Sequence, residues 1–280
     1  MPENIENLPP AAESMTDVAI LASELPAGHH IAPHAHRRNQ LIYARQGVMR
    51  VTTPEGSWVV PPERAVWMPA RLRHEIQCTG AVSMRTIYVG VAAAPRLPRR
   101  CVMLAVSPFM RELLLRLIEA RPAARARRHL VPLILAELSA LPVSPLHLPE
   151  PRDRRLRRLT EALKRDPGHP QRLTDWQRVA GASARTLSRL FAAETGMTFR
   201  QWQRQLRLLV ALEGLAQGRS VTDVALDVGY ESPSAFISVF RQSLGTTPRR
   251  YFAPTRDPAP RRRTRPLRIR GDSGISAPPR

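Results

Sequence analysis

The chain has 280 residues and a formal net charge of +20, with 43 Lys and Arg against 23 Asp and Glu. Its two cysteines are too few for a small secreted fold held together by disulfides. No uninterrupted apolar run comes near the length that a membrane-spanning helix needs, which is about 18 residues. Most of the charge excess lies after residue 151, where residues 152–252 carry 18 basic side chains against 9 acidic ones. This block favours a polyanionic partner, because codon bias explains the scarcity of lysine but not the position of the charge.

Residues 1–16 predict a flexible, proline-containing leader. The leader is acidic and lacks a basic segment followed by an apolar run, so we expect neither a secretory signal nor a membrane partner. Cys78 and Cys101 lie far apart and no CxxC motif occurs, which favours a reduced, cytoplasmic setting.

Residues 17–95 carry the pattern of a small β-rich domain. "MRVTT" alternates before the turn "PEG", "SWVVPP" follows it, and "AVWMPA" and "SMRTIYVGV" are further short apolar runs. Proline and glycine separate these runs. Several short strands at such spacing predict a barrel or a sandwich.

Residues 96–141 change to a helical period. Ser107 is placed to cap a helix that begins at Pro108, and a second apolar stripe runs over 130–141. The stripe of the first helix consists of Phe109, Leu113, Leu114, Leu117 and Ile118. Two apolar helices could close the end of the barrel or form the seam of a homodimer, and the sequence leaves both open.

Residues 142–152 predict an extended, semi-rigid linker, because "PVSPLHLPEP" holds four prolines. Residues 253–280 have no hydrophobic period and predict a disordered basic tail. The arginines of this tail either add nonspecific affinity for nucleic acid or form a solvated surface.

Two stretches of the carboxy-terminal half repeat one pattern. "SARTLSRLF" (183–191) aligns position by position with "SPSAFISVF" (232–240), and Gly181 and Gly229 precede them. A serine oxygen accepts from an unpaired N–H of the first helical turn, so each stretch predicts a capped helix after a glycine turn. Two such units make a duplicated helix-turn-helix.

The segment between the repeats predicts a long, rigid helix. Thr198 and Gln201 form a capping box, and an apolar face that starts at Phe199 and Trp202 continues to about Gln217. Such a helix spans roughly 28 Å, close to the roughly 34 Å between successive major-groove faces of DNA. It could therefore hold two recognition helices in adjacent grooves.

Residues 153–252 resemble the DNA-binding domain of the AraC/XylS family of transcription regulators. The match rests on "RTLSRLFAAETGMTFRQW" and "VTDVALDVGYESPSAFISVFRQSLGTTPRRYF". It implies seven helices with two helix-turn-helix subdomains, a double-stranded DNA operator, and RNA polymerase as a partner if the protein activates. The base-facing residues it implies are Arg185, Thr186, Ser188 and Arg189 in the first recognition helix, and Pro233, Ser234, Ala235 and Ser238 in the second.

The side chains of the two recognition helices differ in what they can read. Arg185 and Arg189 lie one turn apart and could each bind guanine O6 and N7, or bind phosphate instead. Pro233 and Ala235 can offer only shape or thymine-methyl contacts. We therefore expect the first helix to carry more sequence information than the second.

Residues 28–47 resemble the first sequence motif of the cupin superfamily, and residues 56–74 resemble the second, with Arg71 where glycine is usual. Cupins are small β-barrels, and their metal-binding members hold a divalent transition metal with three histidines and a glutamate. The resemblance places these ligands at His34, His36, Gln40 and His74. Because Gln40 replaces the glutamate, the site loses a negative charge and should bind a divalent ion less tightly.

Three uses of these side chains stay open. They could hold a divalent transition metal, line an effector pocket by hydrogen bonding, or be core histidines without a present role. The residues that we expect around an effector are His34, His36, Gln40, Trp58, Arg64, Trp67 and His74. Tryptophans on strands also serve as plain packing residues.

Together these patterns predict an α+β protein, with a cupin-like β-barrel followed by an all-α domain of two helix-turn-helix subdomains. The expected function is sequence-specific transcription regulation, without enzymatic activity, controlled by a small-molecule effector in the barrel. The alternatives are a cupin-type metalloenzyme fused to a DNA-binding domain and a ligand-independent DNA binder.

Overall fold

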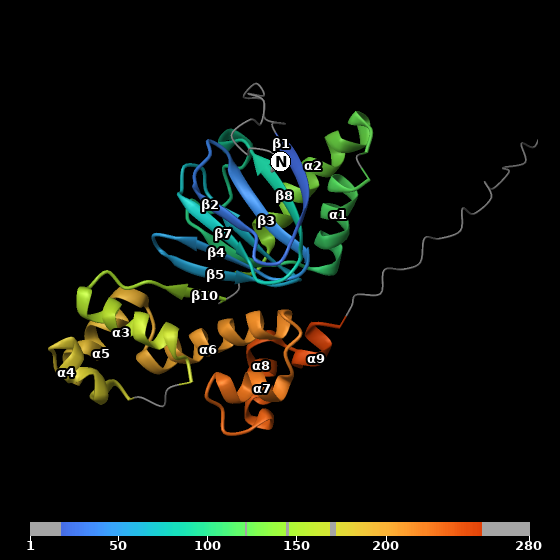
Figure 1. Cartoon of the computed structure of the whole chain (residues 1–280). Coiled ribbons are helices and arrows are strands. Elements are labelled where there is room, and N and C mark those ends of the chain that lie inside the picture. Colours follow the sequence, from blue (N-terminus) through green and yellow to red (C-terminus); the bar gives the residue numbers. More distant parts are fainter. Residues whose placement is uncertain (1–17, 121, 144–145, 169–171, 254–280) are drawn as a thin grey trace, which may run out of the picture.

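The computed structural model describes residues 18–120, 122–143, 146–168 and 172–253, and Figure 1 shows a β-rich part followed by a helical part. This confirms the expected α+β order. The predicted leader over 1–16 and nearly all of the predicted tail over 253–280 lie outside the described residues. Within the described ranges, no helix is long and apolar enough to cross a membrane.

The β-rich part consists of two antiparallel five-stranded sheets. Sheet A has the order β1-β8-β3-β6-β9, and sheet B has the order β10-β5-β4-β7-β2. The strands of sheet A are β1 (Val18–Leu25), β3 (Asn39–Gln46), β6 (Arg64–Met68), β8 (Val82–Val89) and β9 (Val102–Ala105). Those of sheet B are β2 (His30–His34), β4 (Met49–Thr53), β5 (Gly56–Val60), β7 (His74–Cys78) and β10 (His147–Pro149).

The central strands of sheet A are buried on both faces. Along β3, Ile42 and Ala44 join the core between the two sheets, whereas Leu41 and Tyr43 join a second core on the outer side. Successive side chains of a strand point to opposite faces, so the absence of polar alternation in β3 follows from this double cover. The outer core lies under helices α1 (Pro108–Ile118) and α2 (Ala124–Ala140).

Helix α1 begins as its sequence predicts, since the Ser107 side chain accepts from Met110 N. The predicted apolar stripe is wrong at one position. Phe109 is 55% exposed, and Met110 occupies the buried place in the first turn. The two helices cover the outer face of sheet A, where Figure 1 shows them beside β1 and β8.

Two short strands lie in segments where the sequence predicts none. Strand β9 falls within the predicted helical segment 96–141 and pairs with β6, and β10 falls within the predicted linker 142–152 and pairs with β5. A Cβ on Gly56, which has a φ of 145°, would lie 2.4 Å from Leu148 O. Glycine therefore permits the close approach of β10 to β5.

The helical part consists of short helices around one long one. Ser183, Ser220 and Ser232 each accept a backbone N–H at a helix start, and Thr198 forms its predicted capping box with Gln201. The helices are α3 (Arg154–Arg165), α4 (Gln177–Ala180), α5 (Ala184–Thr195), α6 (Phe199–Ala216), α7 (Val221–Asp227), α8 (Pro233–Leu244) and α9 (Pro248–Tyr251), with the 3-10 turn η3 (Leu173–Trp176) before α4. A second 3-10 turn, η2 (Val91–Ala93), lies in the β-rich part between β8 and β9.

One hydrophobic core runs from the space between the sheets into the helical part. It contains Trp58 and Leu148 of sheet B together with Trp202 and Leu206 of α6. The Trp202 indole N–H donates to Pro149 O at 2.9 Å, and Figure 1 shows α6 beneath sheet B, beside β10. The β-rich part therefore packs directly on the helix that connects the two helix-turn-helix units.

Candidate effector and DNA-recognition sites

Three histidines converge inside the β-rich part. His34 ends β2 and pairs with His74 at the start of β7, and His36 lies in the following loop. One ring nitrogen of each lies within 4.8 Å of those of the other two. The ring centroids of His34 and His74 are 4.3 Å apart, and those of His36 and His74 are 5.2 Å apart. The predicted histidine cluster is thus assembled by strand pairing.

Backbone carbonyls orient all three imidazoles in the same way. Each Nδ1 lies within hydrogen-bond distance of a carbonyl two residues away in the chain. The contacts are His34 Nδ1 with Ala32 O at 2.9 Å, His36 Nδ1 with Arg38 O at 2.6 Å, and His74 Nδ1 with Leu72 O at 3.0 Å. A carbonyl can only accept, so Nδ1 carries the proton and the Nε2 lone pair of each neutral ring is left for another partner.

The Nε2 atoms have few partners within the protein. Among the described residues, His34 Nε2 and His74 Nε2 are buried without a hydrogen bond. His36 Nε2 lies 2.8 Å from Gln40 Oε1, while Gln40 Nε2 donates to Tyr88 OH at 3.1 Å. An imidazole lone pair and an amide oxygen repel each other unless a proton or a cation lies between them. The three imidazoles, with the Gln40 side chain beside His36, therefore form a cluster of nitrogen and oxygen donors.

Burial favours the neutral form of the His36 and His74 imidazoles. Desolvation lowers the pKa of His74 to about 4 and also lowers the pKa of His36. A neutral imidazole is the form that binds a metal, and three imidazoles with one amide oxygen suit zinc, iron, nickel or copper. No carboxylate joins this cluster within the described residues. Glu75, which follows His74 in the chain, lies on the opposite face of β7 and pairs with His30 at 3.2 Å.

The loop before His74 is held against the first histidine motif. Arg71 N donates to His36 O at 2.8 Å, and Ala70 N donates to the Asn39 side chain at 3.0 Å. Arg71 has a φ of 65°, a left-handed conformation that favours glycine. This explains the glycine that cupins usually place here, and it shows that the turn forms in this chain with arginine.

The structure does not bring Trp58, Arg64 and Trp67 together with the histidines. Trp58 faces the space between the sheets but stacks on His147, with ring centroids 4.3 Å apart. Arg64 starts β6, at the end opposite Met68, which pairs with Gln40. Trp67 lies in the outer core, the packing role that its sequence leaves open, and its indole N–H donates to Pro98 O at 2.9 Å.

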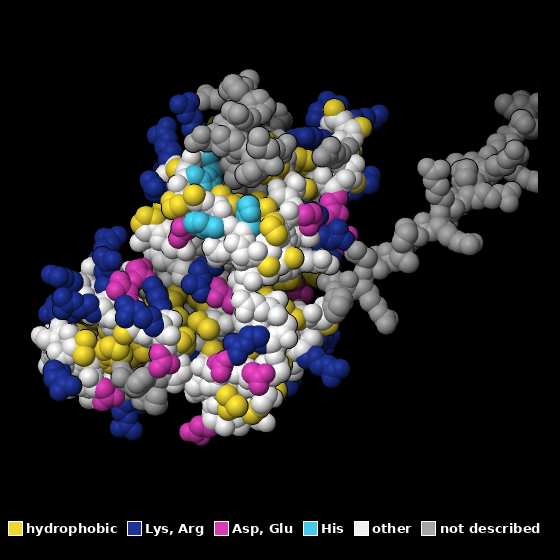
Figure 2. Space-filling model, in the orientation of Figure 1, with side chains coloured by type: hydrophobic (Ala, Val, Ile, Leu, Met, Phe, Trp, Pro, Cys, Tyr) yellow, Lys and Arg dark blue, Asp and Glu magenta, His cyan; other side chains and the backbone are white. Residues whose placement is uncertain are grey.

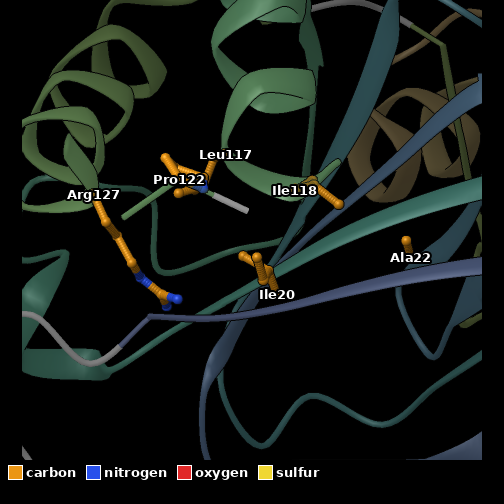
Figure 3. A pocket seen from close by; sticks show the side chains of 6 residues that line it. All are labelled: Ile20, Ala22, Leu117, Ile118, Pro122 and Arg127. Atoms are coloured by element: carbon orange, nitrogen blue, oxygen red, sulfur yellow. The ribbon is translucent and has the colours of Figure 1, made fainter. Parts of the chain in front are cut away.

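A separate pocket of about 280 Å³ lies on the outer side of sheet A, between β1, α1 and α2. Figure 3 shows the aliphatic side chains of Ile20, Leu117 and Ile118 in its wall and the Arg127 side chain extending from α2. The Arg127 guanidinium donates to Val18 O. The β1 side chains that line the pocket lie on the face of sheet A that points away from the histidines. The pocket and the histidine cluster are therefore on opposite sides of this sheet.

The predicted base-facing residues occupy the outer faces of α5 and α8. Arg185, Ser188 and Arg189 are exposed on α5, and Thr186 is half-buried. On α8, Ser234, Ala235 and Ser238 are exposed and Pro233 is half-buried. The inner faces hold Leu187 and Phe191 on α5 and Phe236 and Phe240 on α8, all fully buried. Each recognition helix thus presents a polar face away from its core.

Positive charge surrounds the first of these helices. Figure 2 shows Lys and Arg side chains gathered over the region of α3, α4 and α5. Within the described ranges, neither Arg185 nor Arg189 forms an ion pair that would hold it against the protein surface. Two unneutralised arginines on one exposed helix face suit a polyanion.

Three other residues of interest were not predicted from the sequence. Tyr88 completes the Gln40 network from β8, and Arg50 joins Glu213 across 163 residues of chain. Arg207 on α6 donates to backbone carbonyls of distant loops. Local pattern carries no signal for these contacts, because each joins segments that only the tertiary fold brings together.

Comparison with known proteins covers both parts of the chain. A family model described as an AraC-like ligand binding domain matches residues 19–193, and one described as a helix-turn-helix domain matches residues 176–253. The HTH-type transcriptional regulator NimR of Escherichia coli (strain K12) is 38% identical over 223 residues, covering 79% of this chain and 81% of that protein.

Two further relatives share less with the chain. The HTH-type transcriptional regulator RipA of Corynebacterium glutamicum is 35% identical over 100 residues, covering 36% of this chain and 30% of that protein. A crystal structure of unsaturated fatty acid bound ToxT from Vibrio cholerae is 11% identical, covers 84% of this chain and 94% of that chain, and has a TM-score of 0.36. On the family matches and the likeness to NimR, the chain belongs to the AraC-type transcription regulators, with a ligand-binding domain followed by a helix-turn-helix DNA-binding domain.

Proposed function

We propose that this regulator reads its operator through α5 and α8, within a double helix-turn-helix domain spanning 153–252. The observation that supports this most is the polar outer face of each recognition helix over a fully buried apolar inner face. The proposed base contacts are Arg185, Thr186, Ser188 and Arg189 on α5, and Pro233, Ser234, Ala235 and Ser238 on α8.

Selection of binding sites from random double-stranded DNA by the full chain tests this proposal. We expect one enriched sequence with two separated blocks of preferred bases, and a footprint that covers two successive turns on one side of the duplex. Enrichment of no sequence, or a footprint limited to one turn, contradicts the proposal.

We propose that the histidine cluster is the effector-sensing site, and that it holds a divalent transition metal through His34, His36, His74 and Gln40. The orphaned Nε2 atoms and their uniform Nδ1 anchoring support this use over that of plain core histidines. His34, His36, His74 and Gln40 would hold such an ion, which would supply a Lewis acid for an oxygen or nitrogen atom of an effector. The protein's part is to fix the three rings and to exclude bulk water.

Metal content of the purified chain and titration with Zn²⁺ or Ni²⁺ test the site. His34→Ala and His74→Ala should each remove binding, whereas His30→Ala, which changes an exposed histidine of the same strand, should keep it. A wild-type chain that purifies without metal and binds neither ion contradicts the metal proposal. An effector that still binds the metal-free chain at these histidines would then favour hydrogen bonding alone.

We infer that sheet B carries the effector signal to the DNA-binding domain. His34 and His74 lie on β2 and β7 at one edge of this sheet, and β10 at its other edge contacts α6. Gln77 of β7 pairs with Arg50 of β4, whose guanidinium binds Glu213 on α6. An effector changes DNA binding only if it prefers one arrangement of these parts over another.

The remaining proposals concern the division of the chain into segments and its protein partners. We propose a sensing domain over 17–95, a segment over 96–141 that forms a homodimer, a linker over 142–152, and contact with RNA polymerase where the protein activates. Exposed Phe109 on α1 and Leu133 on α2 support a homodimer seam. The regulators among its relatives support a cytoplasmic protein that acts on DNA and performs no catalysis.

A further inference from the structure

Arg207 connects the two halves of the DNA-binding domain. From α6, its Nε donates to Pro167 O at 2.9 Å and its Nη2 to Gly168 O at 3.4 Å, in the turn after α3. Its Nη1 donates to Gly229 O at 3.1 Å, in the turn between α7 and α8. One guanidinium therefore joins a loop of the first subdomain to the turn of the second helix-turn-helix.

The two loops also touch each other directly. Gly229 has a φ of 81°, and a Cβ on it would lie 2.5 Å from Gly168 O. A Cβ on Gly168 would lie 2.7 Å from Asp227 O. Two glycines thus allow backbone to pack on backbone, and no side chain fits between the turns.

The guanidinium is suited to this position. It is planar with five N–H donors in a fixed fork, so it can serve several carbonyls at once, whereas a lysine ammonium is a single compact charge. Burial lowers the pKa of Arg207, and Tyr230 and Asp166 oppose that shift. Loss of the side chain would leave three loop carbonyls without these donors.

The long helix alone does not fix the second unit in place. Helix α6 ends at Ala216, and α7 follows after a turn at Gly218, close to α6 where a Cβ on Gly214 would lie 3.1 Å from Val224 Cγ2. Arg204 of α6 also contacts α8, because its Nη2 donates to Gln242 Oε1 at 2.6 Å on the exposed surface. Arg207, nine residues before the end of α6, adds a partly buried attachment roughly 14 Å back from that end.

We propose that Arg207 is a positioning residue for DNA recognition, which sets the spacing and angle at which α5 and α8 meet DNA. This inference rests on the proposed use of both recognition helices. Arg207 itself does not read bases, because its donors are directed into the protein. Once α5 is bound, an α8 that is held in place loses less orientational freedom when it binds its own half-site. Arg207 therefore raises the effective concentration of α8 at that half-site.

The test uses the operator selected by the full wild-type chain, with one or two base pairs inserted or removed between the two half-sites. One inserted base pair turns the far half-site by roughly 35°. We expect the wild type to lose about tenfold in affinity per step, and Arg207→Ala to show a flatter dependence on spacing. Arg207→Ala should bind the natural spacing about tenfold less tightly, yet bind an isolated α5 half-site as the wild type does.

Two further variants keep the test decisive if Arg207→Ala unfolds, which its thermal unfolding curve reveals. Gly168→Ala keeps the arginine but pushes the turns apart, and Arg207→Lys keeps the charge but loses the fork; both should flatten the spacing dependence. Arg200→Ala, an exposed arginine of the same helix, should keep the wild-type dependence on spacing.

Unchanged dependence on spacing in folded Arg207→Lys and Gly168→Ala overturns this inference. So does an equal loss on the isolated half-site and the full operator. A wild type that selects only one half-site instead contradicts the proposed function, so the two failures are distinguishable.

Discussion

Arg50 and Glu213 form a two-point ion pair between the sensing domain and the long helix of the DNA-binding domain. Arg50 Nε donates to one carboxylate oxygen at 2.8 Å and Nη2 to the other at 2.5 Å. The Glu213 side chain is 15% exposed and that of Arg50 is 43% exposed. Burial would lower the pKa of Arg50, but the hydrogen bonds and charge of Glu213 raise it above its ordinary value. The pair is therefore a charged link in a contact that also contains the Trp202 bond to Pro149 O.

Removing this link should loosen the sensing domain from α6. In Arg50→Ala the partly buried Glu213 carboxylate loses its partner, so we expect the free energy of unfolding to fall by about 1–3 kcal/mol. Hydrogen exchange should quicken in β10 and along α6, and the effect of any ligand on operator affinity should weaken.

A double-mutant cycle with Glu213→Ala isolates the pair from the two single changes. Arg99→Ala, which changes an exposed arginine in the loop before β9, serves as the control. Wild-type exchange rates in β10 and α6 of Arg50→Ala contradict the link. So does a coupling energy of zero in the cycle.

Local features of this chain are predictable from its sequence, because they depend on neighbours a few residues away. The caps at Ser107, Ser183, Thr198 and Ser232 formed where the sequence placed them. The spacing of His34 and His36 also indicated a shared site, since alternate residues of a strand point the same way.

The features that escaped prediction depend on contacts across the fold. Strands β9 and β10 are too short for a periodic signal and form only because β6 and β5 offer them an edge. The face on which Trp67 lies is not predictable from its sequence, because the central strands of sheet A are buried on both sides and lack alternating polar and apolar residues. Arg50 and Glu213 are far apart in sequence, and neither has a neighbour that indicates the other.

Gln40→Glu should strengthen metal binding at the histidine cluster. A carboxylate restores the negative charge that the amide lacks, and Tyr88 can donate its hydroxyl proton to the new oxygen in place of the present bond. We expect Zn²⁺ affinity, measured by titration calorimetry, to rise by about tenfold or more. Gln77→Glu, which adds the same charge to an exposed position of β7, should leave the affinity near the wild-type value. Equal effects of the two changes would mean that Gln40 is not a ligand.

Mild acid should weaken the contact between β10 and β5 through His147. This ring stacks on Trp58, and burial lowers its pKa from 6.5 to about 4, with Arg100 adding to that shift and a backbone bond to Glu55 opposing it. The unfolded chain binds the proton at higher pH than the folded chain, so the stability contributed by neutral His147 is lost as pH falls from about 6.5 towards 4. Urea unfolding should show a loss of roughly 2 kcal/mol by about pH 5 from this group.

His147→Phe keeps the stacked ring and removes the titrating nitrogen. We expect this variant to be less stable than the wild type near neutral pH, because it loses the bond to the Glu55 backbone, but to lose less stability on acidification. His36 and His74 remain in both proteins, so the difference between the two acid profiles reports His147 alone. Parallel profiles would place the acid sensitivity elsewhere.

Arg185 and Arg189 should differ from the residues of α8 in what their removal does to DNA recognition. Both lie on the exposed face of α5, one helical turn apart, and a bidentate contact with guanine contributes about 1–3 kcal/mol of discrimination. Arg189→Ala should therefore relax base preference at one position of the selected operator. Loss of a phosphate contact would instead weaken binding equally on all sequences and reduce the salt dependence by about one charge. Ser238→Ala, the matched change on α8, should alter base preference less, because a hydroxyl makes a single hydrogen bond where arginine makes two. Site selection repeated with each variant, at two salt concentrations, separates these outcomes. If Ser238→Ala changed base preference more than either arginine variant did, α8 and not α5 would carry more of the sequence information.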